Sequence, residues 1–285
     1  MILKENIFIE PQTLHRLSDQ IPSDDFSDSK FDIDYDKEPS KILIILSTPR
    51  SGSTMLCDFL RKNHVCLAHE YFQPFEYLPL LANRWNCIHK NYVDTESYID
   101  NLIRFRTYPN GWLGINLHGI HIETFSAMRH CFPDAKFHYI YLIRHDIIAQ
   151  AVSYALAAQT GAWSHKFPSK IEPKYDYEKI HSKLFSIQHQ HSIIQAFLKI
   201  NQVRYQIIYY EDLRDNIVQA LNQISYFSQF KFSSSISLKK QSKEINRVWM
   251  NQFSLDYLSS NSSTDQRKGI QSKIKSFLFG NNSKK

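Results

Sequence analysis

Short apolar runs and helix-like patterns alternate along residues 41–258. The runs are rich in Ile, Leu, Tyr and Phe, as buried strands are, and the segments between them repeat apolar residues at helical spacing. Alternating strands and helices indicate βαβ units, so we predict an α/β fold with a central, mainly parallel, five-stranded sheet flanked by helices. The expected strands are 42–46, 65–68, 112–117, 137–143 and 205–210, and the expected helices are 54–62, 74–83, 95–105, 120–130, 147–158, 177–200, 217–227 and 243–258.

The segment Lys41–Leu60, KILIILSTPRSGSTMLCDFL, combines a strand, a small-residue loop and a helix. A loop of this kind directs free backbone N–H groups and the positive end of the helix dipole at one point, which favours anion binding. Gly52 allows close approach of the backbone, and Arg50 adds a fork of donors suited to phosphate-like oxygens. The Walker A pattern, with its lysine, is absent, which disfavours an ordinary nucleotidase or kinase.

Four sequence blocks carry a family resemblance. They are TPRSGST at 48–54 with LCDFLR at 56–61 and HEYF at 69–72, then YLIRHDIIAQAVSYALAAQTGAW at 141–163, YYEDL at 209–213 and QSKEINRVWMNQF at 241–253. Together they resemble the bacterial trehalose 2-sulfotransferase-type family, whose members use the donor 3′-phosphoadenosine 5′-phosphosulfate (PAPS). The resemblance implies a P-loop-like sulfotransferase fold, a PAPS donor and a homodimer.

The resemblance also implies two donor-binding regions. The first loop would hold the 5′-phosphosulfate through Arg50, Ser51, Gly52, Ser53 and Thr54, with Arg50 also neutralising charge on the leaving side. The second block would hold the 3′-phosphate through Arg144 and Ser153. Arg144 follows the expected strand 137–143, and ligands of open α/β sheets bind at the carboxyl ends of strands.

Two residues are candidates for the general base. The resemblance implies Glu70, in HEYF, whereas other sulfotransferases use histidine, which here would be His118. The expected acceptor-binding residues are Glu70, Tyr71, Asn116, Gln159 and Trp163, although Trp163 also suits a core or dimer contact. Asn116 stands where relatives carry a basic residue, so the chain departs from the family pattern there.

Composition and charge indicate how the chain is divided into domains. At 285 residues with 42% hydrophobic residues, the chain is long enough for one large domain with a core. We expect an acidic N-terminal extension at 1–40, whose part 23–39 would be a loose arm, a sulfotransferase domain at 41–258 and a basic tail at 259–285. The extension holds 4 Lys/Arg and 10 Asp/Glu, whereas residues 266–285 hold 6 Lys/Arg and no acid.

The four cysteines show no paired spacing, and neither they nor the 13 histidines form a convincing metal pattern. We therefore expect reduced thiols, a cytoplasmic protein and no metal. The N-terminus is a poor signal peptide and no apolar run approaches the length of a membrane span. The favoured function is PAPS-dependent sulfation of a carbohydrate or glycolipid hydroxyl, with no nucleic-acid partner and a basic tail suited to a membrane surface. The alternative is a non-catalytic nucleotide-binding module whose basic tail recruits an anionic partner.

Overall fold

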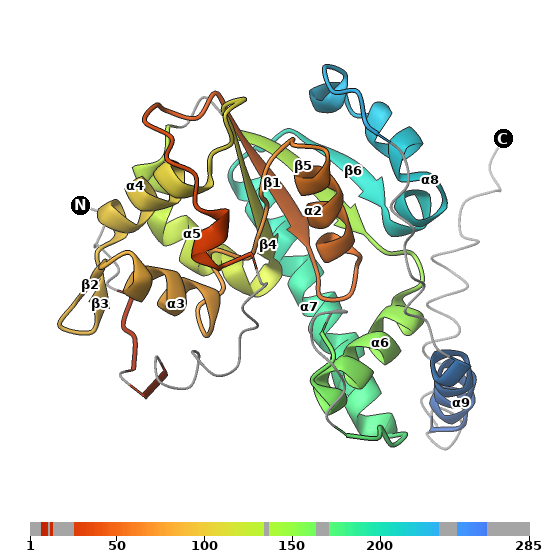
Figure 1. Ribbon diagram of the computed structural model, residues 1–285. Coiled ribbons are helices and arrows are strands. Elements are labelled where there is room, and N and C mark those ends of the chain that lie inside the picture. The colour runs from red at the N-terminus through yellow and green to blue at the C-terminus, as the bar shows by residue number, and fades with distance from the viewer. Residues whose placement is uncertain are drawn as a thin grey trace, which may run out of the picture.

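The computed structural model describes residues 7–10, 12–13, 26–133, 137–163, 171–233 and 244–260. Its main sheet has four strands in the order β4 (Trp112–His118), β1 (Lys41–Ser47), β5 (Phe137–Ile143) and β6 (Tyr205–Tyr209). All three pairings are parallel, which confirms the predicted α/β class. Figure 1 shows β1 inside the sheet between β4 and β5.

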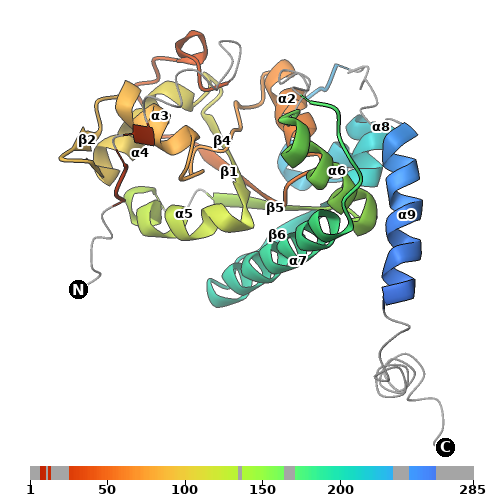
Figure 2. The same cartoon turned by 90° about the horizontal axis from the view of Figure 1, so that it is seen from below.

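The central strand β1 is buried on both faces because both faces are covered. Ile42, Ile44 and Leu46 belong to one apolar cluster, and Leu43 and Ile45 belong to another on the opposite side. Successive side chains of a strand point to opposite faces, so a continuous apolar run is what this position requires. In Figure 2, α5 and α7 lie on one side of the sheet and α2 and α8 lie on the other.

The described helices follow the predicted pattern closely, and the longest has the predicted bounds. They are α2 (Ser53–Lys62), α3 (Tyr77–Arg84), α4 (Thr95–Arg106), α5 (Ile122–Met128), α6 (Ile147–Thr160), α7 (Tyr177–Ile200), α8 (Tyr210–Asn222) and α9 (Glu244–Ser260). A third apolar cluster joins α6, α7 and α9 beside the sheet. None of the described helices is long and apolar enough to cross a membrane.

The fifth predicted strand, Val65–Ala68, does not form. Only its neighbour His69 makes an isolated parallel bridge, to Ile115 of β4. Side chains take the carbonyl groups that a strand ladder would use, since Asn110 donates to the Val65 carbonyl at 2.9 Å and Tyr71 donates to the Leu67 carbonyl at 2.8 Å. The segment is nevertheless buried. Its apolar composition therefore indicates that it lies in the core, and does not indicate that it pairs as a strand.

Helix α8 also departs from its prediction, because it starts at Tyr210 instead of at residue 217. The strand β6 runs directly into it. Asn216 has an extended backbone within this stretch, and its side chain accepts a hydrogen bond from the Gln219 N–H at 3.0 Å, as an N-cap does. The sequence pattern therefore detected only the second of two short helical pieces.

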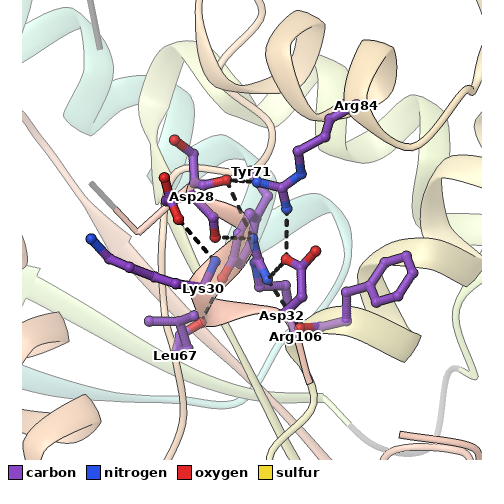
Figure 3. A network of polar contacts seen from close by, with 9 residues as sticks. Asp28, Lys30, Asp32, Leu67, Tyr71, Arg84 and Arg106 are labelled. Carbon is purple, nitrogen blue, oxygen red and sulfur yellow. Dashed lines mark hydrogen bonds and ion pairs between the residues drawn. The ribbon is translucent and has the colours of Figure 1, made fainter. Parts of the chain in front are cut away.

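The described part of the acidic extension is anchored and not loose, which corrects the expectation for 26–39. Figure 3 shows Arg84 and Arg106 converging on the carboxylate of Asp32, with Arg84 at 2.6 Å. Both guanidinium groups also donate to the Ser27 carbonyl. Arg106 is fully buried. We call Asp32, Arg84 and Arg106 the N-terminal ion-pair cluster. It fixes this segment to α3 and α4.

Candidate active site

The loop between β1 and α2 has the backbone shape that anion binding needs. Arg50 and Gly52 both lie in the left-handed region, with φ of 65° and 93°. A Cβ atom on Gly52 would lie 2.5 Å from the Tyr210 ring, so only glycine fits at this contact. The first N–H groups of α2 follow directly, and they have no partner within the helix. The buried Ser51 hydroxyl also has no hydrogen-bond partner among the described residues.

A residue that the sequence analysis missed holds this loop. The fully buried Gln150 of α6 donates from Nε2 to the Thr48 hydroxyl and to the Pro49 carbonyl, both at 2.7 Å. A glutamine on the buried face of an otherwise apolar helix was the available signal, because buried amides need partners. The loop is therefore tied to the same helix that carries Ser153.

Arg50, Arg144 and Ser153 come together although they stand far apart in the sequence. Arg50 Nε donates to the Ser153 hydroxyl at 3.0 Å, and Arg144 donates to the Arg50 carbonyl at 3.2 Å. The carboxyl ends of β1 and β5 place both arginines at one edge of the sheet. We call Arg50 and Arg144 the paired arginines.

The electrostatics of the paired arginines favour an anion. Burial and the charge of Arg144 lower the pKa of Arg50. Burial also lowers the pKa of Arg144, while the charges of Asp146 and Glu211 oppose this shift. The Arg144 guanidinium lies 4.6 Å from the Tyr210 ring centroid, and its buried Nε has no hydrogen-bond partner among the described residues. Two partly buried like charges repel, so an anion that contacts both would stabilise them.

The two candidate bases, Glu70 and His118, lie next to each other in the structure. The bridge between His69 and Ile115 brings the following residue, Glu70, to the end of β4. There the Glu70 Oε2 atom lies 3.7 Å from His118 Nδ1 and 3.8 Å from His121 Nε2. The three side chains are close enough together to hold a metal ion, a grouping that the expectation of no metal pattern overlooked.

Two of the predicted acceptor-binding residues, Tyr71 and Asn116, are buried. Tyr71 is fully buried and its hydroxyl donates to the Leu67 carbonyl, so its ring packs in the core instead of facing an acceptor. Asn116 is 2% exposed, and its Oδ1 atom accepts from the Ser47 hydroxyl at 3.0 Å. The Tyr71 hydroxyl and the Asn116 Oδ1 atom thus have hydrogen-bond partners inside the protein. The substrate-binding role of the two residues stays a prediction.

Gln159 and Trp163 remain at the surface of the site region. The Trp163 side chain is 42% exposed, and its backbone carbonyl accepts a hydrogen bond from Arg50. Its ring packs edge-on against Tyr154 with centroids 6.0 Å apart. Gln159 lines a cavity of about 840 Å³ between α6 and α7, together with Lys174, Ser182 and Lys183.

Tyr154 is a further residue that the sequence analysis did not single out. It follows Ser153 on α6, and Lys183 lies 4.7 Å from its ring centroid. Burial raises the pKa of Tyr154, a hydrogen bond with Ser186 opposes this rise, and the charge of Glu70 adds to it. Tyr154 therefore lies within electrostatic range of Glu70 and in contact with Trp163.

Comparison with known proteins supports a sulfotransferase. Residues 123–256 match the family model described as Stf0 sulphotransferase, which confirms the resemblance to the trehalose 2-sulfotransferase-type family. The matched range includes Arg144 and Ser153 but not the loop at 48–52 or Glu70. None of the curated proteins matches the chain significantly.

Several solved sulfotransferase structures resemble this chain only weakly. A sulfotransferase domain from the curacin biosynthetic pathway is 20% identical, covers 69% of this chain and 76% of its own, and has a TM-score of 0.45. Sulfotransferase STF9 from Mycobacterium avium is 12% identical, with coverages of 76% and 68% and a TM-score of 0.41. Mouse sulfotransferase SULT7A1, complexed with PAP, is 14% identical, with coverages of 79% and 66% and a TM-score of 0.36. At these scores the likenesses carry no argument about the site.

Proposed function

We propose that the protein is a PAPS-dependent sulfotransferase that moves a sulfuryl group to a hydroxyl of a carbohydrate or glycolipid. The observation that supports this most is the meeting of Arg50, Arg144 and Ser153 at the carboxyl ends of β1 and β5. The donor carries phosphate groups at both ends of its ribose, and the resemblance assigns one end to each arginine. The Ser51 hydroxyl and Arg144 Nε are buried polar atoms without a hydrogen-bond partner in the part of the chain that the structure describes, and such a ligand would satisfy them.

The proposed transfer is a single in-line displacement. The acceptor oxygen attacks sulfur, and the bond between sulfur and the bridging phosphate oxygen breaks. The electron pair of that bond leaves with 3′,5′-adenosine bisphosphate (PAP), and the acceptor proton passes to Glu70. Arg50 and the loop N–H groups stabilise the charge that grows on the leaving phosphate, as protein groups do in phosphoryl transfer.

Glu70 is the favoured base, with His118 beside it. Glu70 is the more accessible of the two, because its side chain is 22% exposed and that of His118 is 11% exposed. Tyr154 and Trp163, whose rings pack edge-on, would form an apolar wall suited to a sugar face. These features support a carbohydrate acceptor. The cytoplasmic location and the homodimer stay predictions, and most of the basic tail lies outside the described residues.

The experiment is transfer of a radiolabelled sulfuryl group from PAPS to the components of a cell extract, followed by identification of the labelled product. We expect a labelled carbohydrate or glycolipid. Glu70→Gln should lower turnover about 100-fold or more, which is the usual effect of losing a general base. Glu123→Gln, an exposed carboxylate on α5, is the matched control and should leave turnover unchanged.

Three outcomes separate the alternatives. Near-full activity of Glu70→Gln with loss of activity in His118→Ala would assign the base to His118. Binding of PAP without any labelled product would favour the nucleotide-binding module. Absence of both binding and transfer would contradict the proposed function.

A further inference from the structure

Two histidines face the same carboxylate oxygen of Glu70. His118 is the last residue of β4, and His121 is the last residue of the 3₁₀ helix Gly119–His121 that follows it. Their rings stack with centroids 5.0 Å apart and an interplanar angle of 24°. Both histidines approach the Oε2 atom of this carboxylate.

The hydrogen-bond network assigns the tautomer of His121. The backbone N–H of His118 donates to His121 Nδ1 at 3.1 Å. A ring nitrogen that accepts an N–H carries no proton, so the single proton of a neutral imidazole sits on Nε2. Nε2 is the atom that faces Glu70. His121 therefore presents an N–H group to the carboxylate.

The protein also keeps His121 neutral. Its side chain is 1% exposed, and burial together with the charges of His118 and His69 lowers its pKa well below the usual value. The turn packs closely on α7, because a Cβ on Gly119 would lie 2.7 Å from the backbone of Gln190. The His121 ring is thus buried and held by the hydrogen bond from the His118 N–H.

This tautomer argues against a metal ion at Glu70, His118 and His121. A metal ligand needs a lone pair, and a metal-bound histidine usually donates its other ring N–H to a neighbour. In His121 the arrangement is reversed, since Nδ1 accepts from the backbone and Nε2 carries the proton. A metal ion at Nε2 would require this single ring proton to move to Nδ1, and Nδ1 could then no longer accept the hydrogen bond from the His118 N–H.

We propose that His121 is a positioning residue, which orients the Glu70 carboxylate through its Nε2–H group so that Oε1 faces the acceptor hydroxyl. The proposal rests on the proposed function. The 3.8 Å separation is longer than a hydrogen bond. Contacts of this kind are often long before substrates bind and shorten in the complex, so we expect this contact to shorten when the donor and acceptor bind.

Nuclear magnetic resonance tests this without any acceptor. Long-range ¹H–¹⁵N correlations of protein labelled at histidine report which ring nitrogen is protonated, and His121→Gln assigns the signals. We expect His121 to be the Nε2–H tautomer at neutral pH and its Nε2 resonance to move in Glu70→Gln. The matched control Glu123→Gln should leave that resonance in place. An Nδ1–H tautomer, or no response to Glu70→Gln, would overturn the proposal.

A pair of substitutions separates positioning from a purely structural role. Gln at position 121 can supply an N–H group near Nε2, whereas Leu cannot. The carboxyl ¹³C resonance of Glu70 should therefore stay near its wild-type position in His121→Gln and move in His121→Leu. Equal shifts in both variants would contradict positioning. Once the acceptor is known, kcat should fall about tenfold in His121→Leu, with KM for the donor unchanged, and should recover in His121→Gln.

Two further results keep the claims distinct. Zn²⁺ added to the wild-type protein should leave the His121 resonances unchanged, and stoichiometric binding at Nε2 would overturn the assigned role. Failure of the wild-type protein to bind PAP would contradict the proposed function but not the tautomer of His121. Binding of PAP with the wrong tautomer would contradict only the positioning role.

Discussion

Two pairs of arginines in this molecule, each at least partly buried, have opposite electrostatic surroundings. In the N-terminal ion-pair cluster, Arg84 and Arg106 share the carboxylate of Asp32. In the paired arginines, the contacts of Arg144 are the Arg50 carbonyl and the Tyr210 ring, and Arg50 donates to the Ser153 hydroxyl. The first pair takes its anion from the chain itself. The hydrogen bonds of the second pair go to a carbonyl and a hydroxyl, while the charges of Asp146 and Glu211 raise the pKa of Arg144 without a direct ion pair to it within the described residues.

The difference explains why one pair stabilises the fold and the other is suited to binding. A buried ion pair with its partners in place holds segments together, and removing one partner leaves the other charge exposed to desolvation. Like charges held together lower one another's pKa, as Arg144 does to Arg50, and so cost stability until a ligand arrives. Substitutions in the two pairs should therefore act in different ways.

The largest expected effect is on turnover in Arg50→Met. Loss of the cation on the leaving side should lower kcat roughly 100- to 1,000-fold, the scale of losing one preorganised donor. The unfolding free energy should stay unchanged or rise, because the repulsion between the paired arginines is removed. Turnover with labelled PAPS and urea denaturation measure the two quantities. Destabilisation without loss of turnover would reverse the comparison.

A smaller effect, on stability alone, is expected for Arg106→Met. Asp32 and the Ser27 carbonyl would lose a fully buried partner, so the unfolding free energy should fall by about 3 kcal/mol. Arg104→Met, which breaks the exposed pair with Asp34, is the matched control and should cost less than about 1 kcal/mol. Equal effects of the two substitutions in urea denaturation would show that the N-terminal ion-pair cluster is not what anchors the segment.

The smallest expected effect is a pH dependence of stability from His121. The pKa of His121 in the folded protein lies well below 6.5. Below pH 6.5, therefore, the unfolded chain binds a proton at this residue that the folded protein does not bind. Stability should be unaffected above pH 6.5 and should fall as the pH drops below it, by up to about 1.4 kcal/mol per unit. Denaturation at pH 7.5 and 5.5 should show this loss in wild type and His189→Gln but less of it in His121→Gln. Identical losses in all three would contradict the assignment.

The sequence predicted the repetitive parts of the fold well because they follow from periodicity. The bounds of β5 and α7 agree with their patterns, and the apolar run of β1 signals burial on both faces. The pattern fails where tertiary contacts decide. Val65–Ala68 is as apolar as a strand, but side chains occupy its carbonyl groups. The acidic segment from residue 26 onward looks loose until Arg84 and Arg106 are known to meet it.

The same limit applies to the site. The resemblance names Arg50, Arg144 and Ser153, and the structure brings these three together. It also names Tyr71, whose hydroxyl the core uses instead. Gln150 could not be found from the motif, because its role depends on the direction in which a buried amide points.

The most direct test of the paired arginines is calorimetric titration with PAP and with adenosine 5′-monophosphate, which lacks the 3′-phosphate. We predict that wild type prefers PAP and that Arg144→Met loses this preference, with PAP affinity falling about 10- to 100-fold, the value of one charge-assisted contact. Arg247→Met, which removes an exposed charge on α9, should behave as wild type. Equal affinities of wild type for the two nucleotides, or an unchanged preference in Arg144→Met, would contradict the donor site.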